Sequence, residues 1–256
     1  MLHSKSPKTL PTNHPTQPYT TLYNTIQPYT THMFTRTIQL IGEDGFRALQ
    51  NARVILFGVG GVGGWCAETL LRTGIGHLTL VDFDKVDTTN LNRQVVATHE
   101  NIGQSKVVEM QKRLLSICPA ADVQAIDQQY NSDTADTFNL AQYDIVIDAI
   151  DMVECKALLL YNATAAGCRV YSSMGAGRKT DPQKIRTAEF WKVQGCPLAR
   201  ALRTKMKKAG LMPASKIQCV YSEEIAGEKG TLAPVVGVFG MTIAAMVIEH
   251  LAQQNS

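Results

Sequence analysis

The sequence predicts an α/β fold: a Rossmann-like, mostly parallel twisted sheet with helices on both faces, and a mixed strand and helix extension at the C-terminus. Two observations support this. Short β-type runs alternate with segments of helical periodicity, which is typical of βαβ units. In addition, a G-x-G-G-x-G cluster at residues 58–63 joins the first predicted strand to the first predicted helix. Such a turn brings backbone N–H groups against phosphate oxygens, so a nucleotide site is expected there.

The elements follow in order along the chain. Pro119 ends the second helix of the alternating part, and beyond residue 177 the alternation fades. In the alternating part, the predicted strands are 52–59, 77–83, 121–127, 143–150 and 168–174, and the predicted helices are 60–73, 103–117 and 153–166. In the extension, we predict strands at 184–191 and 216–222, a basic helix at 196–208 and an apolar helix at 235–248.

Residues 1–32 differ from the rest of the chain. They hold five of the ten prolines and two copies of QPYTT, and they lack the periodic apolar residues that would offset the entropy of ordering. Two interpretations stay open: a disordered tail, or an upstream stretch preceding a true start at Met33. The remainder, 33–252, is predicted to be a single domain, with 178–232 as a basic substrate-binding portion.

Composition limits the function classes. The net charge of +3 is mild, and none of the six cysteines lies in a C-x-x-C pair, so the usual zinc pattern is absent and no zinc is expected. Scattered, core-like cysteines suit a reducing cytosol, so a cytoplasmic protein is expected. The longest apolar run, 235–248, is interrupted by Gly237 and Gly240 and is too short for a membrane span, so no membrane association is expected.

The residues after the glycine cluster indicate which nucleotide is bound. Gly58, Gly60, Gly61 and Gly63, with Asp82 at a distance suited to ribose hydroxyls, serve NAD and ATP equally well. Asn90, Arg93 and Lys106 then place fixed cations and an amide near the phosphates, which a reaction that breaks a triphosphate requires. Asp151 is a candidate ligand for Mg²⁺. Because ligands bind beyond the carboxyl ends of parallel strands, the glycine cluster, Asp82, Asp84, Asp148 and Asp151 should converge there.

Taken together, these motifs resemble the ubiquitin-activating-like adenylating enzymes, the superfamily of the molybdopterin and thiamine sulfur-carrier activators. The matching residues are the glycine cluster, D-x-D at Asp82 and Asp84, N-x-N-R-Q from Asn90, G-x-x-K ending at Lys106, and D-x-x-D ending at Asp151. The resemblance implies that ATP lies across the glycine loop, with Asn90, Arg93 and Lys106 on the triphosphate and Asp151 on magnesium. It also implies a homodimer in which Arg36 reaches the ATP of the partner subunit.

A narrower resemblance concerns the substrate. The stretches FTRTIQLIGEDGFRAL, GAGRKTDPQKI, CPLARALRTKMKKAG and CVYSEE resemble the tRNA threonylcarbamoyladenosine dehydratase branch. The branch implies adenylation of the threonyl carboxylate, followed by attack of the neighbouring carbamoyl group. Residues 182–222 hold nine basic residues and one acidic residue, a charge pattern that can bind a polyanion. The candidate tRNA contacts are Arg178, Lys179, Lys192, Arg200, Arg203, Lys207 and Lys208.

Other interpretations stay open at this stage. The chain can be an activator of a ubiquitin-like sulfur-carrier protein, an NAD-dependent oxidoreductase, or a binding module with an inactive ATP site. Cys196 stands where relatives often have an aspartate, and Cys219 lies where some relatives have a cysteine linked with sulfur-relay partners; a structural role is expected for both. A sulfur-relay protein is therefore a possible partner.

Overall fold

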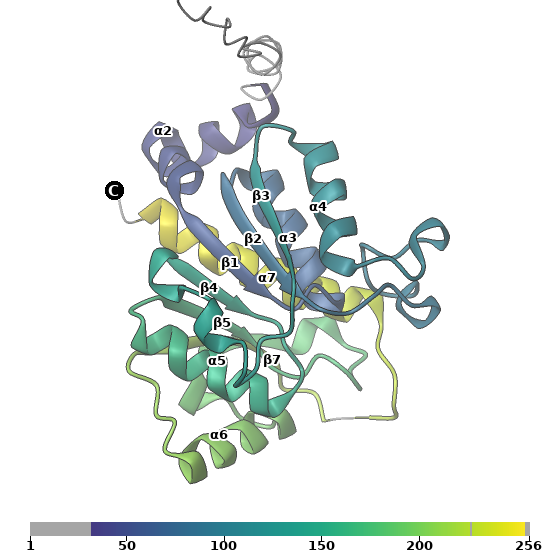
Figure 1. Ribbon diagram of the computed structural model, residues 1–256, viewed down its shortest axis with the longest axis vertical. Coiled ribbons are helices and arrows are strands. Elements are labelled where there is room, and N and C mark those ends of the chain that lie inside the picture. Colours follow the sequence, from purple (N-terminus) through teal and green to yellow (C-terminus); the bar gives the residue numbers. More distant parts are fainter. Residues whose placement is uncertain (1–31, 226, 254–256) are drawn as a thin grey trace, which may run out of the picture.

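The computed structural model describes residues 32–225 and 227–253, and in this part of the chain seven strands form one sheet (Figure 1). Their spatial order is β3-β2-β1-β4-β5-β7-β6. All neighbours pair in parallel except β6, which pairs with β7 in the antiparallel sense. The strands are β1 (Arg53–Phe57), β2 (His77–Asp82), β3 (Asp122–Asp127), β4 (Ile145–Asp148), β5 (Arg169–Ser173), β6 (Ile185–Glu189) and β7 (Ile217–Ser222).

Side-chain alternation along the central strands gives the sheet a separate core on each face. Val54 and Leu56 of β1 belong to one cluster of buried side chains, while Ile55 and Phe57 belong to the other. Strand β1 is therefore buried on both faces, as expected for a central parallel strand between helical layers. Its uninterrupted apolar sequence, RVILF, reflects that position.

Four helices cover the first face: α2 (Thr35–Asn51), α3 (Gly61–Thr73), α4 (Lys106–Ile117) and α7 (Ala233–Gln253). Helix α2 is kinked at Gly42, whose φ of 77° is outside the helical range. Gly240 allows α7 to lie directly on α3, because a Cβ added there would come within 2.4 Å of the Val62 carbonyl oxygen. The last helix of the chain thus packs beside the helix that follows the glycine cluster.

Helices α5 (Val153–Ala165) and α6 (Pro197–Ala209) cover the second face. In α6, Ala199, Leu202 and Met206 are buried at helical spacing, which leaves the charged positions between them facing outward. Short 3-10 helices lie in the connections, at η1 (Thr88–Asn90), η2 (His99–Asn101), η3 (Ala135–Thr137), η4 (Leu140–Gln142), η5 (Pro182–Lys184) and η6 (Phe190–Lys192).

The predicted α/β architecture is confirmed. Each predicted strand and helix of 52–248 is present, with ends that differ by a few residues. The C-terminal extension is not a separate layer: β7 pairs with β5 and continues the parallel sheet, and β6 forms its antiparallel edge. Helix α2 was not predicted as a helix. The interpretations of residues 1–31 lie outside the described residues.

Helix α7 is the one described helix long and apolar enough to cross a membrane by length and composition. Half of its apolar window is buried inside the domain (50%), with Val235, Phe239, Ile243 and Val247 in the first core. Contacts of this kind are those of a core helix, and they account for its apolar sequence without a bilayer.

Candidate functional site

The glycine turn between β1 and α3 is so tight that it has no room for a side chain at Gly58 or Gly63. Gly58 has φ of 91°, and a Cβ added to it would lie 2.7 Å from the Ala149 carbonyl oxygen. A Cβ added to Gly63 would lie 1.8 Å from the Gly58 carbonyl oxygen. Gly60 and Gly61 line the adjoining cavity, whereas Gly63 supports the turn from behind. The turn therefore leaves backbone open to a ligand at the start of α3.

Asp82, at the end of β2, holds this turn in place. One carboxylate oxygen accepts the Val59 N–H at 2.6 Å and the other accepts the Asp84 N–H at 2.9 Å. Burial raises the pKa of Asp82, although these two backbone hydrogen bonds and nearby Lys106 oppose the shift. The residue predicted to bind ribose thus also fixes the loop predicted to bind phosphate, which the sequence spacing alone does not show.

Lys106 begins α4 and reaches the same cavity. Its side chain is only 6% exposed, and its ammonium lies 2.8 Å from Asp84 Oδ2. The Lys106 N–H also donates to the Asp84 carbonyl oxygen, so α4 and the end of β2 are joined twice. A nearly buried cation in a cavity wall is a strong attractor for phosphate, because little water screens it.

Asn90 and Arg93 belong to a short irregular segment at 88–94. Asn90 is buried, and its side-chain oxygen accepts the Asp87 N–H. The Arg93 guanidinium donates to the Thr89 carbonyl oxygen at 2.6 Å, and the Trp65 indole N–H donates to the Arg93 carbonyl oxygen. These bonds anchor the segment to α3, so Asn90 and Arg93 both line the cavity as predicted.

Gln94 is a cavity residue that the sequence analysis did not single out. The residue is 7% exposed, and the oxygen of its side-chain amide has no hydrogen-bond partner among the described residues. Its amide nitrogen lies 3.8 Å from the position that a Cβ on Gly60 would take. A buried, unpaired amide beside a phosphate cradle is suited to bind a polar ligand. The signal was present as the last residue of N-x-N-R-Q.

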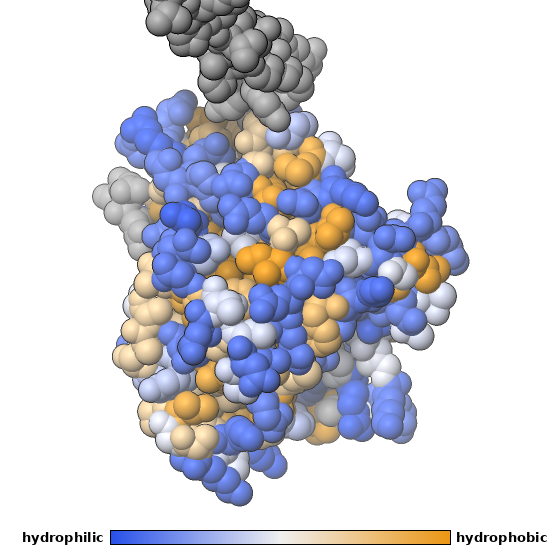
Figure 2. Space-filling view, viewed as in Figure 1, coloured by the Kyte–Doolittle hydropathy of each residue, from blue (hydrophilic) through white to orange (hydrophobic). Residues whose placement is uncertain are grey.

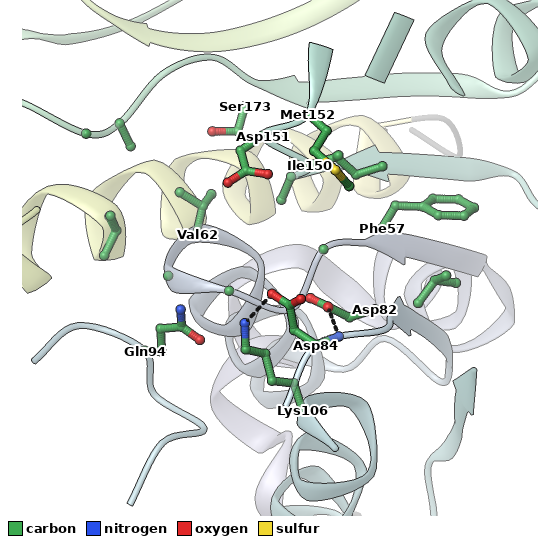
Figure 3. Close-up of a pocket in the computed structure, with 18 of the residues that line it drawn as sticks. Phe57, Val62, Asp82, Asp84, Gln94, Lys106, Ile150, Asp151, Met152 and Ser173 are labelled. Atoms are coloured by element: carbon green, nitrogen blue, oxygen red, sulfur yellow. Dashed lines mark hydrogen bonds and ion pairs between the residues drawn. The ribbon is translucent and has the colours of Figure 1, made fainter. Parts of the chain in front are cut away.

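The loop 149–152 brings Asp151 to the cavity from the far side. Figure 3 shows the Asp151 carboxylate facing the group formed by Asp82, Asp84 and Lys106. Asp148 does not join them, contrary to the expected convergence: it is fully buried beneath the loop and pairs with Lys156. The described residues contain no cluster of three or more His, Cys, Asp or Glu side chains that could hold a metal on their own.

Together these residues enclose one cavity of about 630 Å³. Its floor is the glycine turn, one wall carries Asp82, Lys106 and Arg93, and the opposite wall is the segment 173–177 after β5. Leu198 of α6 and Thr231 close it toward the C-terminal portion. The cavity has the size, cations and backbone cradle for a nucleoside triphosphate.

The predicted tRNA contacts have different environments. Lys179 is 4% exposed and donates to the Glu224 carbonyl oxygen, so the structure argues against a direct contact. The Arg203 guanidinium donates to three carbonyl oxygens, those of Phe190, Trp191 and Val193, and is used to hold η6. Sequence charge alone does not distinguish such structural cations from surface ones.

The other predicted contacts lie on the surface. Lys192, Arg200 and Lys208 are exposed and form no ion pair within the described residues. The Lys207 ammonium lies over the Trp191 ring. Figure 2 shows hydrophilic side chains along the end of the molecule where Figure 1 places α6. Arg178 is exposed, with φ of 64°, and its side chain donates to the Gly227 carbonyl oxygen.

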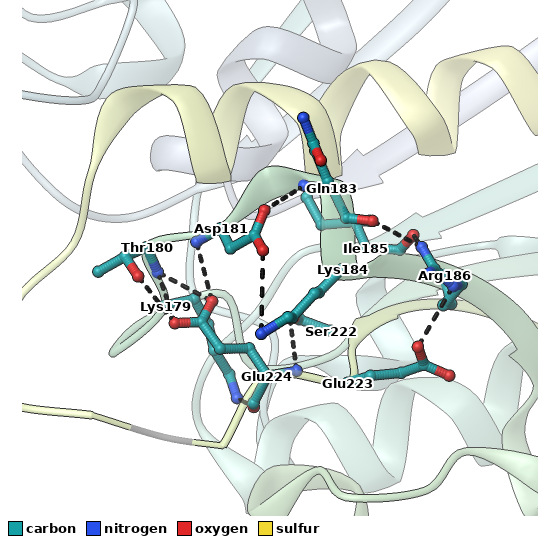
Figure 4. Close-up of polar contacts among 10 residues, drawn as sticks. All are labelled: Lys179, Thr180, Asp181, Gln183, Lys184, Ile185, Arg186, Ser222, Glu223 and Glu224. Carbon is teal, nitrogen blue, oxygen red and sulfur yellow. Dashed lines mark hydrogen bonds and ion pairs between the residues drawn. The ribbon is translucent and has the colours of Figure 1, made fainter.

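Glu224 ties this portion of the chain together. Its carboxylate accepts the N–H groups of Thr180 and Asp181 and the Thr180 hydroxyl, as Figure 4 shows. Hydrogen bonds from Asp181 and Thr180 lower the pKa of Glu224. The segment after residue 177 is thereby held against the end of β7, next to the cavity wall.

The remaining candidates lie away from the cavity. Arg36 is exposed on α2 and does not line the cavity of its own chain. Cys196 and Cys219 are buried, and burial raises the pKa of the Cys219 thiol, which disfavours a reactive thiolate.

Comparison with known proteins gives a consistent result. The model of the ThiF family matches residues 34–256. The tRNA threonylcarbamoyladenosine dehydratase of Bacillus subtilis is 39% identical over 193 residues, which are 75% of each chain. The crystal structure of the E. coli tRNA N6-threonylcarbamoyladenosine dehydratase, TcdA, in complex with ATP has a TM-score of 0.85 at 32% identity, covering 90% of this chain and 97% of that one. The molybdopterin-synthase adenylyltransferase of E. coli is 31% identical over 82% of this chain and 76% of its own length.

Proposed function

The chain belongs to the ThiF family, and we propose that it uses ATP to dehydrate threonylcarbamoyladenosine in tRNA. One observation carries the proposal: the glycine turn, Arg93, Lys106 and Asp151 surround a single cavity. A relative of the same fold, 32% identical, was crystallised in complex with ATP.

The charges around the cavity suggest the orientation that we propose for ATP. Its phosphates would lie over the N–H groups at the start of α3, with Arg93 and Lys106 beside them, and its ribose would reach Asp82. Because Lys106 is held by Asp84 at 2.8 Å, its ammonium already faces the cavity before any phosphate binds. Preorganised cations of this kind stabilise the negative charge that develops when the bond between the α- and β-phosphates breaks. The Gln94 side-chain NH₂, which lies next to Gly60, would supply a further donor.

The proposed reaction has two steps. An oxygen of the threonyl carboxylate attacks the α-phosphorus of ATP, and pyrophosphate leaves. The carbamoyl group then attacks the activated carbonyl carbon and loses a proton, and AMP leaves with the carboxylate oxygen. The substrate has lost one water, and no protein thiol takes part, in keeping with the burial of Cys196 and Cys219. Holding the two groups in reacting orientation contributes about 7–11 kcal/mol to lowering the barrier.

A magnesium ion would be held by Asp151 and the phosphates. The exposed Asp151 carboxylate faces the cavity and has no ion-pair partner among the described residues. This donor set fits Mg²⁺, which takes one or two carboxylates together with phosphate oxygens and waters. The ion would supply charge neutralisation at the phosphates.

The tRNA would approach over α6. The first turn of this helix contributes Leu198 to the cavity, and its outer face carries Arg200, Lys207 and Lys208, with Lys192 close by in sequence. Phosphate contacts from these side chains would bring the modified adenosine to the wall formed by 173–177. We include Arg178, which is exposed, and leave out Lys179 and Arg203, which are less exposed and whose cationic groups bind backbone carbonyls inside the domain.

We further propose a cytoplasmic homodimer in which Arg36 reaches the partner's cavity. The support is that Arg36 is exposed and outside its own cavity. Adjacent apolar surface is available as well, since Leu40 of the same helix is 86% exposed.

The decisive experiment incubates the chain with ATP, Mg²⁺ and tRNA carrying threonylcarbamoyladenosine, and measures nucleoside mass. We expect loss of one water and formation of AMP and pyrophosphate. Arg93→Ala should lower the rate by about 100- to 1,000-fold, because it removes a cation from the developing charge. Arg53→Ala, an exposed residue at the opposite end of β1, is the control. An unchanged substrate mass with the unaltered chain would contradict the proposal.

A second candidate is activation of a sulfur-carrier protein, which the similarity to the molybdopterin-synthase adenylyltransferase favours. It predicts pyrophosphate exchange that depends on a small protein ending in Gly-Gly and is indifferent to tRNA. An NAD-dependent oxidoreductase would leave Arg93 and Lys106 without a role, and stabilisation by NAD rather than by ATP with Mg²⁺ in a thermal-shift assay would favour it.

A further inference from the structure

A fully buried ion pair lies beneath the loop that carries Asp151. The Lys156 ammonium is 2.7 Å from Asp148 Oδ2, and both side chains are 0% exposed. Asp148 ends β4 and Lys156 lies in the first turn of α5, so the pair spans the base of the loop 149–152. Burying two charges is costly, and proteins retain such pairs only where further hydrogen bonds satisfy them.

Those further bonds are directed at the loop itself. Ile150 is held at both of its backbone groups: its N–H donates to Asp148 Oδ1 at 3.1 Å, and its carbonyl oxygen accepts from Lys156 Nζ at 3.0 Å. The Ser172 hydroxyl completes the network by donating to Asp148 Oδ2 at 2.6 Å. The residue immediately before Asp151 is therefore clamped by the pair.

The loop is held from the other side by the glycine turn. The Ala149 N–H donates to the Phe57 carbonyl oxygen at 2.8 Å, and the Ala149 carbonyl oxygen occupies the space that a side chain on Gly58 would need. With residues 149 and 150 both fixed, the backbone that carries Asp151 is held beside the cavity.

We propose that Lys156 and Asp148 are positioning residues that fix the direction of the Asp151 carboxylate and thereby set the affinity of the site for Mg²⁺. The inference rests on the proposed role of Asp151 in holding that ion. Mg²⁺ requires near-octahedral geometry, so a carboxylate that must first be ordered binds it more weakly. Residues that orient metal ligands typically change metal affinity by about 10- to 100-fold when replaced.

The test uses the double variant Asp148→Asn/Lys156→Met, which removes both charges and keeps similar volumes, so that no unpaired charge is left in the core. Two affinities are measured by calorimetry on the full chain: that of AMP without metal, and that of ATP over a range of Mg²⁺ concentrations. We expect the Mg²⁺ concentration for half-maximal tightening of ATP binding to rise about 10-fold. AMP affinity should stay within about twofold, because the glycine turn and Asp82 are untouched.

A purely structural role predicts a different result, in which AMP affinity falls with ATP affinity and the Mg²⁺ requirement is unchanged. That result, or an unchanged pair of affinities, would overturn the inference. Ser172→Ala removes one bond and no charge, so it tests the same point if the double variant does not fold. It should raise the Mg²⁺ requirement about threefold, in line with the loss of one hydrogen bond, and no rise would likewise overturn the inference.

Two further variants separate this inference from the proposed function. Asp151→Asn should raise the Mg²⁺ requirement at least as much as the double variant does. If Asp151→Asn has no effect, the proposed metal role itself is wrong; if it has an effect and the double variant has none, only the positioning role is wrong. Glu154→Gln, which breaks the exposed pair of the same helix with Lys205, is the matched control and should change neither affinity.

Discussion

The nucleotide cavity and the α6 surface both depend on charged side chains, but they place them differently. In the cavity, backbone groups help to hold the acidic residues in place. Two backbone N–H groups bind the Asp82 carboxylate, and Asp148 and Lys156 bind the backbone of Ile150, the residue before Asp151. On the α6 side, charge is abundant and only partly available, because Lys179 and Arg203 bind carbonyl oxygens within the domain. The spacing of the motifs therefore predicts where the cavity residues lie. The basic composition of the α6 side predicts only that this surface is positively charged, and not which side chains are free to bind a ligand.

The largest expected effect tests how strictly the cavity depends on backbone packing. Gly63→Ala would place a Cβ 1.8 Å from the Gly58 carbonyl oxygen, so the turn must open. We expect activity to fall by about 100-fold or more, because the phosphates would shift relative to Arg93 and Lys106. Overpacking should also lower the free energy of unfolding by about 1–3 kcal/mol.

Gly61→Ala is the matched control in the same turn. Its Cβ would meet the Val236 side chain at 3.3 Å, a contact that a small shift of that side chain relieves. Steady-state kinetics and denaturant unfolding of both variants give the comparison. Equal losses for Gly61→Ala and Gly63→Ala would show that the turn is not the rigid element described above.

The next effect separates structural from surface cations on one helix. Arg203→Met removes a guanidinium that three carbonyl oxygens share, and we expect a loss of about 1–2 kcal/mol in the free energy of unfolding. Arg200→Met, one turn earlier, should leave that free energy within about 0.5 kcal/mol. It should weaken tRNA binding about two- to fivefold at low salt, since one phosphate contact is lost.

Filter binding of tRNA and urea unfolding measure the two quantities. Lys112→Met, on α4 at the opposite face of the sheet, controls for general loss of positive charge. If Arg203→Met weakened tRNA binding without lowering the free energy of unfolding, Arg203 would be a tRNA contact, as the sequence predicted.

The smallest effect concerns pH. Burial raises the pKa of Asp82 above its ordinary value of 3.8, so this carboxyl takes up a proton at a higher pH in the fold than in the unfolded chain. A ribose hydroxyl donates to the ionised carboxylate. AMP affinity should therefore fall as pH decreases through the raised pKa. Over the same range the contribution of Asp82 to the stability of the fold should become more favourable, because the folded chain binds the proton more tightly than the unfolded chain.

Calorimetry of AMP binding between neutral pH and the lower limit of solubility measures this dependence. Asp82→Asn should bind AMP more weakly and lose the pH dependence. Asp127→Asn, which changes the exposed residue paired with Asp82 on β3, should behave like the unaltered chain. A steep fall in affinity that persists in Asp82→Asn would assign the titration to another group.

The sequence predicted the fold and most of the cavity because both depend on local signals. Short apolar runs that alternate with helical segments specify the strands. Asp82 lies at the end of β2 and Asp151 shortly after the end of β4, so both are found at the same edge of the sheet. It did not predict that Asp148 lies beneath the site and pairs with Lys156, since the last side chain of a strand and one in the loop after it can face opposite ways. Gln94 was missed, although it ends the N-x-N-R-Q motif, because a neutral amide draws attention only once its burial is known. The structural use of Arg203 depends on carbonyl groups of η6 that only the tertiary fold brings near.

The packing of α7 on α3 also determines when the site becomes complete during synthesis. Val236, near the start of the last helix, is the side chain nearest to Gly61 of the glycine turn. The turn emerges from the ribosome long before the helix that backs it, and domains fold as their chain becomes available. A nascent chain that ends before residue 233 therefore has the strands of the nucleotide site without the support of its first helix. ATP binding should accordingly appear only once α7 has packed on α3, as one of the last steps of folding.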